Sequence, residues 1–372
     1  MVNPASFLVA CNATANPFPF SPGFDIALVA SVAQALPSHS WEFGTASEAL
    51  LELFDPLYLG LWGDCVSRTD DSEGIKIVIG TGANGLSDGE GAVGDPASLG
   101  VSAVLLGKSD AKYANAVKEQ IDYIINSAPR FWNGAISHRV EVAELWADFI
   151  YMAPPFLAYA AADTGDLDLL HEAYLQCGRY RQILQRDGGV WEHIIGPQHQ
   201  DTGLWSTSNA WAAAGMARVL ATVMKAPVAT SASWRSDAIC DLSSWIKEII
   251  DDAMSFSTDG GLLRNYLDNT SGDGQGFGEI SGTSMLAAVA YRMVVLRPSD
   301  FGKRYIRWAE RIRATMGLYI SSSGIAAPAV NPMNSRDTTP LTSGSPEGNN
   351  FVVLMYAAWR DCVLLKVCNN EG

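Results

Sequence analysis

Segments with the periodicity of an α-helix follow one another along the whole chain, and they are of two alternating kinds. Segments of the first kind are rich in Ala, Gly and aromatic residues and carry few charges; they cover residues 143–162, 208–224, 281–296 and 349–368. Segments of the second kind are amphipathic with a charged face; they cover residues 111–126, 167–186, 237–254 and 303–318. A helix that is apolar on most sides is typical of a buried position, whereas an amphipathic helix keeps one face in water. The alternation therefore predicts an inner layer of buried helices inside an outer layer of half-exposed ones.

Closing such helical hairpins into a ring buries the inner helices and leaves a funnel at one end. Polar residues near the predicted starts of the inner helices recur 53 to 72 residues apart, as expected for a repeat of helix pairs; they are Asp95, Asp148, Asn209, Ser281 and Asn350. We therefore expect an all-α fold, an (α/α)6 barrel of six helical hairpins, formed as a single domain by residues 1–372. An open solenoid is the structural alternative, although solenoid repeats are usually shorter and more regular.

The charge balance and the apolar stretches limit the partners of the chain. A formal net charge of −15 without any run of Lys or Arg argues against nucleic acid. The longest apolar stretches, such as FIYMAPPFLAYAAA, are shorter than the roughly 18–20 residues that a membrane-spanning helix needs. We therefore expect no nucleic acid and no membrane among the partners, and we expect the protein to be a monomer.

Six cysteines are spread along the chain without a CxxC motif or a Cys/His cluster, so we expect no metal site. The sequence leaves open whether some of these cysteines form disulfides. The first 20 residues lack the basic segment of a signal peptide and resemble a mature N-terminus behind an added Met. Two Asn-x-Ser/Thr sequons, at Asn12 and Asn269, together with the acidic balance favour a secreted protein.

Asp148 is the one charged residue in residues 145–162, the apolar and aromatic part of the segment ELWADFIYMAPPFLAYAAADTG. An ionised carboxylate in apolar surroundings is unfavourable by several kcal/mol or more unless it is paired or its pKa rises, so Asp148 is either a satisfied structural group or a working acid. On a continuous helix Glu144 would share a face with Asp148, and Trp146 would point elsewhere. A carboxylate neighbour can raise the pKa of a general acid, although Glu144 could equally be a solvated residue of the first turn.

Aromatic and polar residues gather in GVWEHIIGPQHQDTGLWSTSNAWAAAG, ahead of an inner helix and in its first turns; they are His193, His199, Trp205, Asn209 and Trp211. Sugar faces stack on aromatic rings while their hydroxyl groups take directed hydrogen bonds, so the combination is typical of a sugar site. The alternative is that the tryptophans belong to the core and that Asn209 belongs to a helix cap.

The Gly-rich stretch GANGLSDGEGAVGDPASLG carries three acids, Asp88, Glu90 and Asp95. It lacks the Gly-Lys-Ser/Thr of a phosphate-binding loop and the spacing of a calcium loop. We expect it to position one carboxylate over the funnel.

The motif LWADFIYMAPPFLA, preceded by APRFWNGAISHR and followed by VWEHI, WSTSNAWAAAG and EISGTSMLAAVA, resembles the unsaturated glucuronyl and rhamnogalacturonyl hydrolases of glycoside hydrolase families 88 and 105. The resemblance covers about residues 85–295, and the family fold is the (α/α)6 or six-hairpin barrel. It implies that Asp148 is the catalytic aspartate and that Asp95, or else Asp88, is the second. It further implies that the substrate pocket is lined at five matching positions, namely His138, His193, Trp205, Asn209 and Trp211, and we add Glu144 to these binding residues. The family often has Trp-x-Arg-Gly-Asn-x-Trp where this chain has Thr207 and Ser208, so the arginine expected to hold a uronate carboxylate is missing.

The resemblance also implies the chemistry. The substrate is a short oligosaccharide of the pectin or rhamnogalacturonan type, left by a lyase with a C4=C5 double bond in its terminal uronic acid. Asp148 protonates C4 and then activates the water that adds at C5, Asp95 stabilises the charge that develops, and no cofactor is needed. Two alternatives are a conventional inverting glycosidase on saturated sugars and a carbohydrate-binding protein without catalysis.

Overall fold

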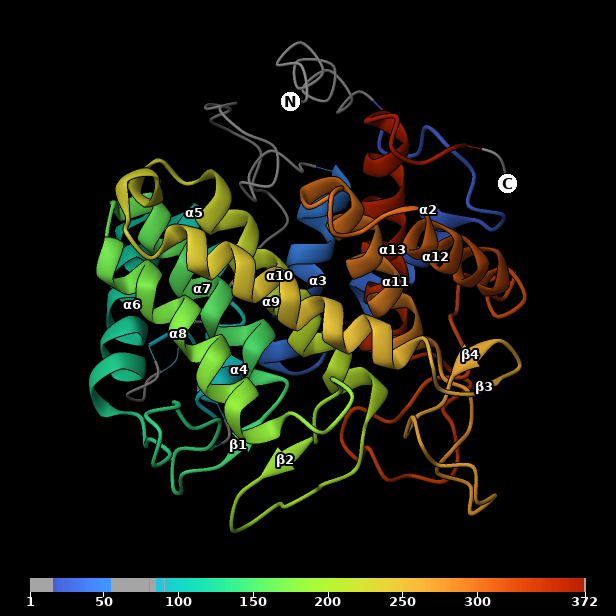
Figure 1. The fold of residues 1–372 in the computed structure, drawn as a ribbon, viewed down its shortest axis with the longest axis horizontal. Coiled ribbons are helices and arrows are strands. Elements are labelled where there is room, and N and C mark those ends of the chain that lie inside the picture. Colours follow the sequence, from blue (N-terminus) through green and yellow to red (C-terminus); the bar gives the residue numbers. More distant parts are fainter. Residues whose placement is uncertain (1–15, 55–79, 81–84, 90, 371–372) are drawn as a thin grey trace.

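A computed structural model of the chain describes residues 16–54, 80, 85–89 and 91–370. Its described inner helices are α3 (Ser40–Phe54), α5 (Gly100–Gly107), α7 (Phe149–Thr164), α9 (Ser206–Lys225), α11 (Ile280–Leu296) and α13 (Pro346–Leu364). Each of them contacts the next, and α13 returns to contact α3, so the ring is closed. Figure 1 labels these helices. The predicted all-α barrel of helical hairpins is confirmed.

The outer layer alternates with the inner one along the chain. Its described members are α2 (Ile26–Ala35), α6 (Ala111–Asp122), α8 (Leu167–Leu184), α10 (Arg235–Ala253) and α12 (Lys303–Met316). Helix α11 has its first fifteen residues buried, whereas α12 buries six of its fourteen, as the predicted alternation requires. Short elements complete the described fold: α4 (Gly94–Ala97), η3 (Tyr123–Ser127), η4 (Pro227–Ser231) and two antiparallel pairs, β1 (Leu145–Trp146) with β2 (Ile194–Ile195) and β3 (Thr258–Asp259) with β4 (Leu262–Leu263).

Side chains at the helix starts define where several helices begin. Asp25, Asp110, Asp166 and Ser345 each accept a hydrogen bond from a backbone N–H in the first turn of the helix that follows. Such caps satisfy N–H groups that have no partner within the helix. At the other end of α7, Gly165 adopts a φ of 74°, a left-handed conformation that glycine takes without strain.

Small residues allow the inner helices to pack closely. A Cβ atom added to Gly215 of α9 would lie 2.0 Å from the backbone oxygen of Ile150 in α7. Only glycine permits that approach of two helix backbones, which explains the Ala/Gly-rich composition of the inner segments.

A buried network of charges closes the inner ring near the C-terminal ends of its helices. Glu52 of α3 is bound at 2.7 Å by Arg218 of α9 and at 2.7 Å by Arg292 of α11, and Arg292 also binds Asp361 of α13 at 2.6 Å. Burial alone would raise the pKa of Glu52, but the arginines outweigh it and lower that pKa. The network, which we call the basal network, consists of Glu48, Glu52, Arg218, Arg292, Arg360 and Asp361.

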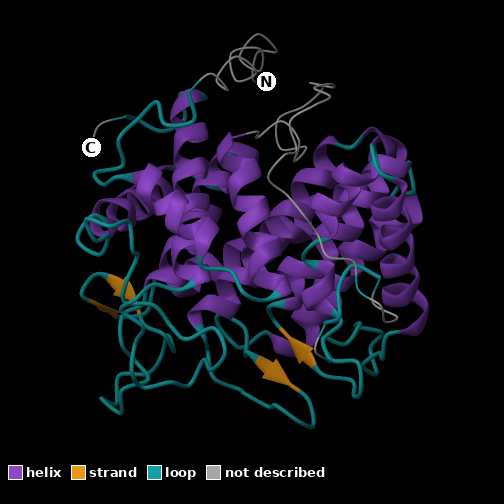
Figure 2. Cartoon of the chain, turned by 180° about the vertical axis from the view of Figure 1, so that it is seen from behind, coloured by secondary structure: helices purple, strands orange, loops and turns teal. Residues whose placement is uncertain are grey.

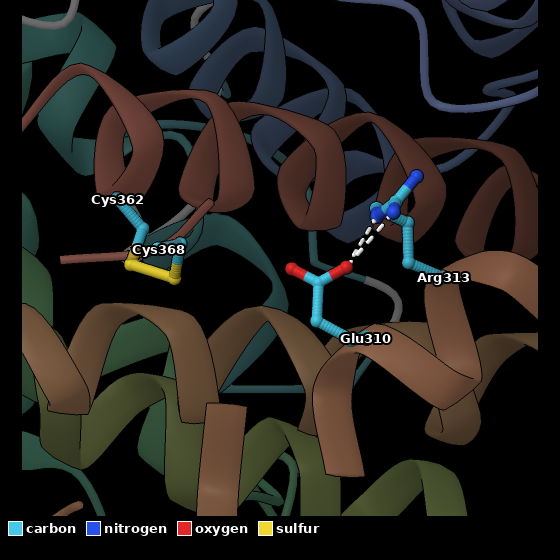
Figure 3. The surroundings of a disulfide bond; sticks show 4 residues. All are labelled: Glu310, Arg313, Cys362 and Cys368. Carbon is cyan, nitrogen blue, oxygen red and sulfur yellow. Dashed lines mark hydrogen bonds and ion pairs between the residues drawn. A yellow bond between two sulfur atoms is a disulfide. The ribbon is translucent and has the colours of Figure 1, made fainter. Parts of the chain in front are cut away.

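The two ends of the barrel differ. The long loops and both strand pairs gather at one end, as Figures 1 and 2 show, whereas the C-terminal end of α13 lies at the other. There a disulfide joins Cys362 to Cys368, next to the ion pair of Glu310 with Arg313 (Figure 3). Cys177 and Cys240 are free thiols, whereas Cys11 and Cys65 lie outside the described residues, as does the Asn12 sequon.

Candidate active site

A cavity of about 550 Å³ opens at the loop end of the barrel, at the starts of several inner helices. Six of the predicted site residues line it: Asp95, His138, Asp148, His193, Trp205 and Trp211. Because they come from four separate stretches of the chain, their convergence follows from the ring closure. Glu144 and Asn209 do not line the cavity.

Asp148 immediately precedes the first residue of α7 and forms an ion pair with His193, the two closest atoms being Oδ2 and Nε2 at 3.4 Å. Its side chain makes no capping bond to the helix, so it is available to a ligand. His193 also contacts Asp201 through its other ring nitrogen, Nδ1 to Oδ2 at 3.1 Å. Burial by itself would lower the pKa of His193, but the two carboxylates outweigh it and raise that pKa.

Asp201 holds this histidine in place and was missed by sequence reasoning. Its carboxylate accepts hydrogen bonds from Tyr266 at 2.7 Å and from the backbone of Gly203 at 3.0 Å, and it forms an ion pair with Arg336 at 3.0 Å. Burial acts to raise the pKa of Asp201, but its hydrogen bonds, led by the one to His193, keep that pKa well below the usual range. Asp201 therefore stays ionised and favours the protonated form of His193.

On another wall of the cavity Asp95 approaches His138, with Asp95 Oδ1 and His138 Nε2 3.4 Å apart. The His138 ring stacks on the Trp146 ring, with the two ring centroids 4.8 Å apart. Burial lowers the pKa of His138 to about 3, so this imidazole is neutral when His193 is protonated. The competing candidate Asp88 is exposed and does not line the cavity, which favours Asp95 as the second acid. Glu90 lies outside the described residues.

Glu144 was predicted to lie beside Asp148 on one helical face and to contact the substrate, but the structure places it neither on α7 nor in the cavity wall. The helix starts at Phe149, and the residues before it form β1, so Glu144 and Asp148 do not share a helical face. The buried Glu144 carboxylate instead accepts hydrogen bonds from Trp146 Nε1 at 2.7 Å and from the backbone of Gln198 and His199 at 2.9 and 2.8 Å. These bonds lower its pKa against the effect of burial, and they anchor the loop that carries His199.

Asn209 was also predicted as a substrate contact, but it does not line the cavity. Its side chain is fully buried, accepts a hydrogen bond from Trp191 N at 2.7 Å and donates to the carbonyl oxygens of Trp191 and Trp205. The alternative, that Asn209 belongs to a helix cap, does not describe these bonds either, because its Oδ1 accepts from Trp191 and α9 has no side-chain cap. Trp146, expected to point elsewhere, lines the cavity.

Several residues of the cavity carry no motif in the sequence. They are Trp41 at the start of α3, Glu347 at the start of α13 and the segment Pro332–Arg336 between α12 and α13. These residues lie far from Asp148 along the chain. The local sequence motif around Asp148 therefore cannot reveal that they share its cavity.

Some of the buried polar atoms that lack a hydrogen-bond partner among the described residues belong to side chains that line this cavity. They include His138 Nδ1 and Glu347 Oε2, while Asp148 Oδ2 and His193 Nε2 have only their ion pair with each other. A buried polar atom that lacks a partner is unfavourable by about 1–3 kcal/mol, and such atoms gathered at one cavity are typical of a ligand-binding site. No group of three or more His, Cys, Asp or Glu in the described part of the chain could hold a metal ion, and none of its helices could span a membrane.

A closed ring of helical hairpins, with carboxylates, histidines and tryptophans around one cavity, is a six-hairpin fold with a site suited to carbohydrate chemistry. Residues 99–311, more than half of the chain, match Glycosyl Hydrolase Family 88, and the chain belongs to that family.

Similar proteins agree with that assignment. The chain is 28% identical over 135 residues to the unsaturated rhamnogalacturonyl hydrolase YesR of Bacillus subtilis, a match that covers 33% of this chain and 39% of the relative. The fold is similar to that of a possible family 105 member from Salmonella enterica, with a TM-score of 0.69 at 16% identity over 90% of this chain and 93% of the other. It is also similar to that of the unsaturated glucuronyl hydrolase of Bacillus sp. GL1, with a TM-score of 0.52 at 15% identity over 72% of this chain and 73% of the other.

Proposed function

We propose that the protein removes a 4,5-unsaturated uronic acid from the non-reducing end of short oligosaccharides that a lyase has produced. The observation that carries this proposal is the chain of contacts from Asp148 through His193 to Asp201 in a cavity walled by tryptophans. An acid that faces an open cavity next to a histidine is suited to transferring protons, and the tryptophans offer faces on which a sugar ring stacks.

In the proposed reaction Asp148 donates a proton to C4 of the C4=C5 double bond, and positive charge develops at C5 and the ring oxygen. Asp148 then takes a proton from a water molecule as that water adds to C5. The hemiketal so formed opens and releases the rest of the oligosaccharide. Asp201 holds His193 in position to orient Asp148, and Asp95 stabilises the developing positive charge.

The test is incubation with unsaturated disaccharides made by rhamnogalacturonan and glycosaminoglycan lyases, followed by ultraviolet absorbance. Loss of the absorbance of the double bond together with release of the second sugar supports the proposal. Release of saturated sugars without that loss would identify a conventional inverting glycosidase instead. If the protein binds the disaccharides but neither the absorbance falls nor any sugar is released, it is a binding protein.

We further propose that Arg336 binds the carboxylate of the terminal uronic acid. Arg336 lies in the cavity wall with its side chain 55% exposed, and the hydrogen bonds of Ser335 with Asn265 and Tyr266 fix its loop. Its contacts with Asp201 and the carbonyl of Gln200 both involve Nη2. A guanidinium has five N–H donors, so this group can bind a second carboxylate.

Replacing Arg336 with Gln should raise KM for the unsaturated disaccharide about 10- to 100-fold, as expected for a lost hydrogen bond to a charged group. The methyl ester of the same disaccharide has no carboxylate charge, so wild type and Arg336→Gln should have similar KM values for it. Arg304→Gln is the matched control, because Arg304 is 58% exposed and pairs with Asp251 away from the cavity. An equal rise in KM for the free acid and for the methyl ester would contradict the proposal that Arg336 binds the carboxylate.

We propose that the protein is secreted and monomeric and that it acts on fragments of pectin. The Cys362–Cys368 disulfide supports an oxidising compartment, because disulfides are rare in the cytosol. Detection of the processed chain in culture medium tests the secretion, and sedimentation tests the monomer.

A further inference from the structure

A second buried acid, Glu347, lies in the cavity wall and takes no part in the proposed proton transfers. It is the second residue of α13, and its side chain is almost fully buried. Trp41 Nε1 donates a hydrogen bond to its Oε1 at 2.9 Å, whereas Oε2 is buried without a partner among the described residues. The hydrogen bond from Trp41 therefore fixes one oxygen of the Glu347 carboxyl group and leaves the other oxygen for a ligand.

The surroundings of Glu347 favour its neutral form. The charged groups that act on it most strongly are two further acids, Glu42 of α3 and Asp148 at the start of α7. Burial, together with these charges, raises the pKa of Glu347 to about 8. Below that pH the group is a carboxylic acid with one O–H donor.

The neighbouring Trp41 supplies a surface for a sugar ring. His39 stacks on Trp41 with ring centroids 4.6 Å apart, while Trp41 also lines the cavity. A sugar stacked against an indole directs its hydroxyl groups outward from the ring edge, where neighbouring polar groups can bind them.

We infer that Glu347 is a substrate-binding residue that acts as a neutral acid, donating a hydrogen bond from Oε2 to a hydroxyl oxygen of the uronyl oligosaccharide. The identity of this ligand rests on the proposed function. An ionised Glu347 would instead add a further negative charge to a cavity that already contains Asp95, Asp148 and Asp201, and it would repel a uronate.

The experiment measures calorimetric binding of a saturated uronyl disaccharide, which lacks the double bond, to the full chain. At pH 6 Glu347→Gln should bind within about threefold of wild type because the amide also donates, whereas Glu347→Met should bind about 10-fold more weakly for the lost hydrogen bond. Glu119→Met, on the exposed face of α6, is the matched control and should bind like wild type.

A pH series gives the second readout. Between pH 6 and pH 9 wild-type binding should weaken as Glu347 ionises, and Glu347→Gln should lose that part of the pH dependence. Equal affinities of the Gln and Met variants at pH 6, or identical pH profiles of wild type and Glu347→Gln, would overturn the inference. Binding does not require turnover, so a wild type that binds this disaccharide but leaves the unsaturated one intact would refute the proposed reaction alone.

Discussion

Replacing Asp148 with Asn should lower kcat on the best unsaturated disaccharide by about 10³-fold or more, because in the proposed reaction this one carboxyl group performs both proton transfers. Asn has nearly the same volume and can still accept a hydrogen bond. Since Asp148 makes no capping bond to α7, the helix loses no cap in the variant. The thermal melting curve should therefore stay close to that of wild type, and substrate binding should persist.

Asp163→Asn is the matched control for that measurement. Asp163 lies near the other end of α7, is exposed and pairs with Lys108, so the change should leave kcat unaltered. A kcat for Asp148→Asn within tenfold of wild type would show that Asp148 is not the proton donor, and Asp95 would then be the next acid to test.

Replacing Glu52 with Gln should lower the free energy of unfolding by about 3–5 kcal/mol, as expected when one partner is removed from a buried ion pair. Glu52 binds two arginines at once, and both would lose their charged partner inside the barrel. Denaturant unfolding followed by circular dichroism measures the change. Because Glu52 does not line the catalytic cavity, the folded variant should keep its turnover.

A surface ion pair provides the comparison. Asp300 and Arg297 are both partly exposed, so Asp300→Asn should change the free energy of unfolding by less than about 1 kcal/mol. If both substitutions have the same small effect, the basal network does not stabilise the ring.

The sequence predicted the alternation of inner and outer helices because burial determines which faces of a helix are apolar, and that pattern is local. The same local pattern is misleading at Glu144. Helical periodicity predicts that the helix extends back to this residue, but pairing of Leu145 and Trp146 with Ile194 and Ile195 gives the backbone there an extended conformation. The competing hydrogen bonds come from a segment about fifty residues away, which no local pattern contains.

The site was predictable only in part, for a related reason. Asp148, His193 and Trp205 lie within short distinctive stretches, whereas Trp41, Arg336 and Glu347 become neighbours of these only when the ring closes. Asn209 has the polarity of a binding residue, yet its hydrogen bonds all go to backbone, and only the three-dimensional structure distinguishes the two uses.

The direction in which the inner helices run has an electrostatic consequence. The starts of α3, α7, α9 and α13 all reach the cavity. The aligned peptide dipoles of a helix place roughly half a positive charge at its N-terminus, so these helices together produce a positive potential there. A protein with a net charge of −15 can therefore repel long polyanions at a distance and still attract the short anionic end of a chain that has entered. This local attraction originates in the backbone, and it would survive substitutions that change which sugar the side chains select.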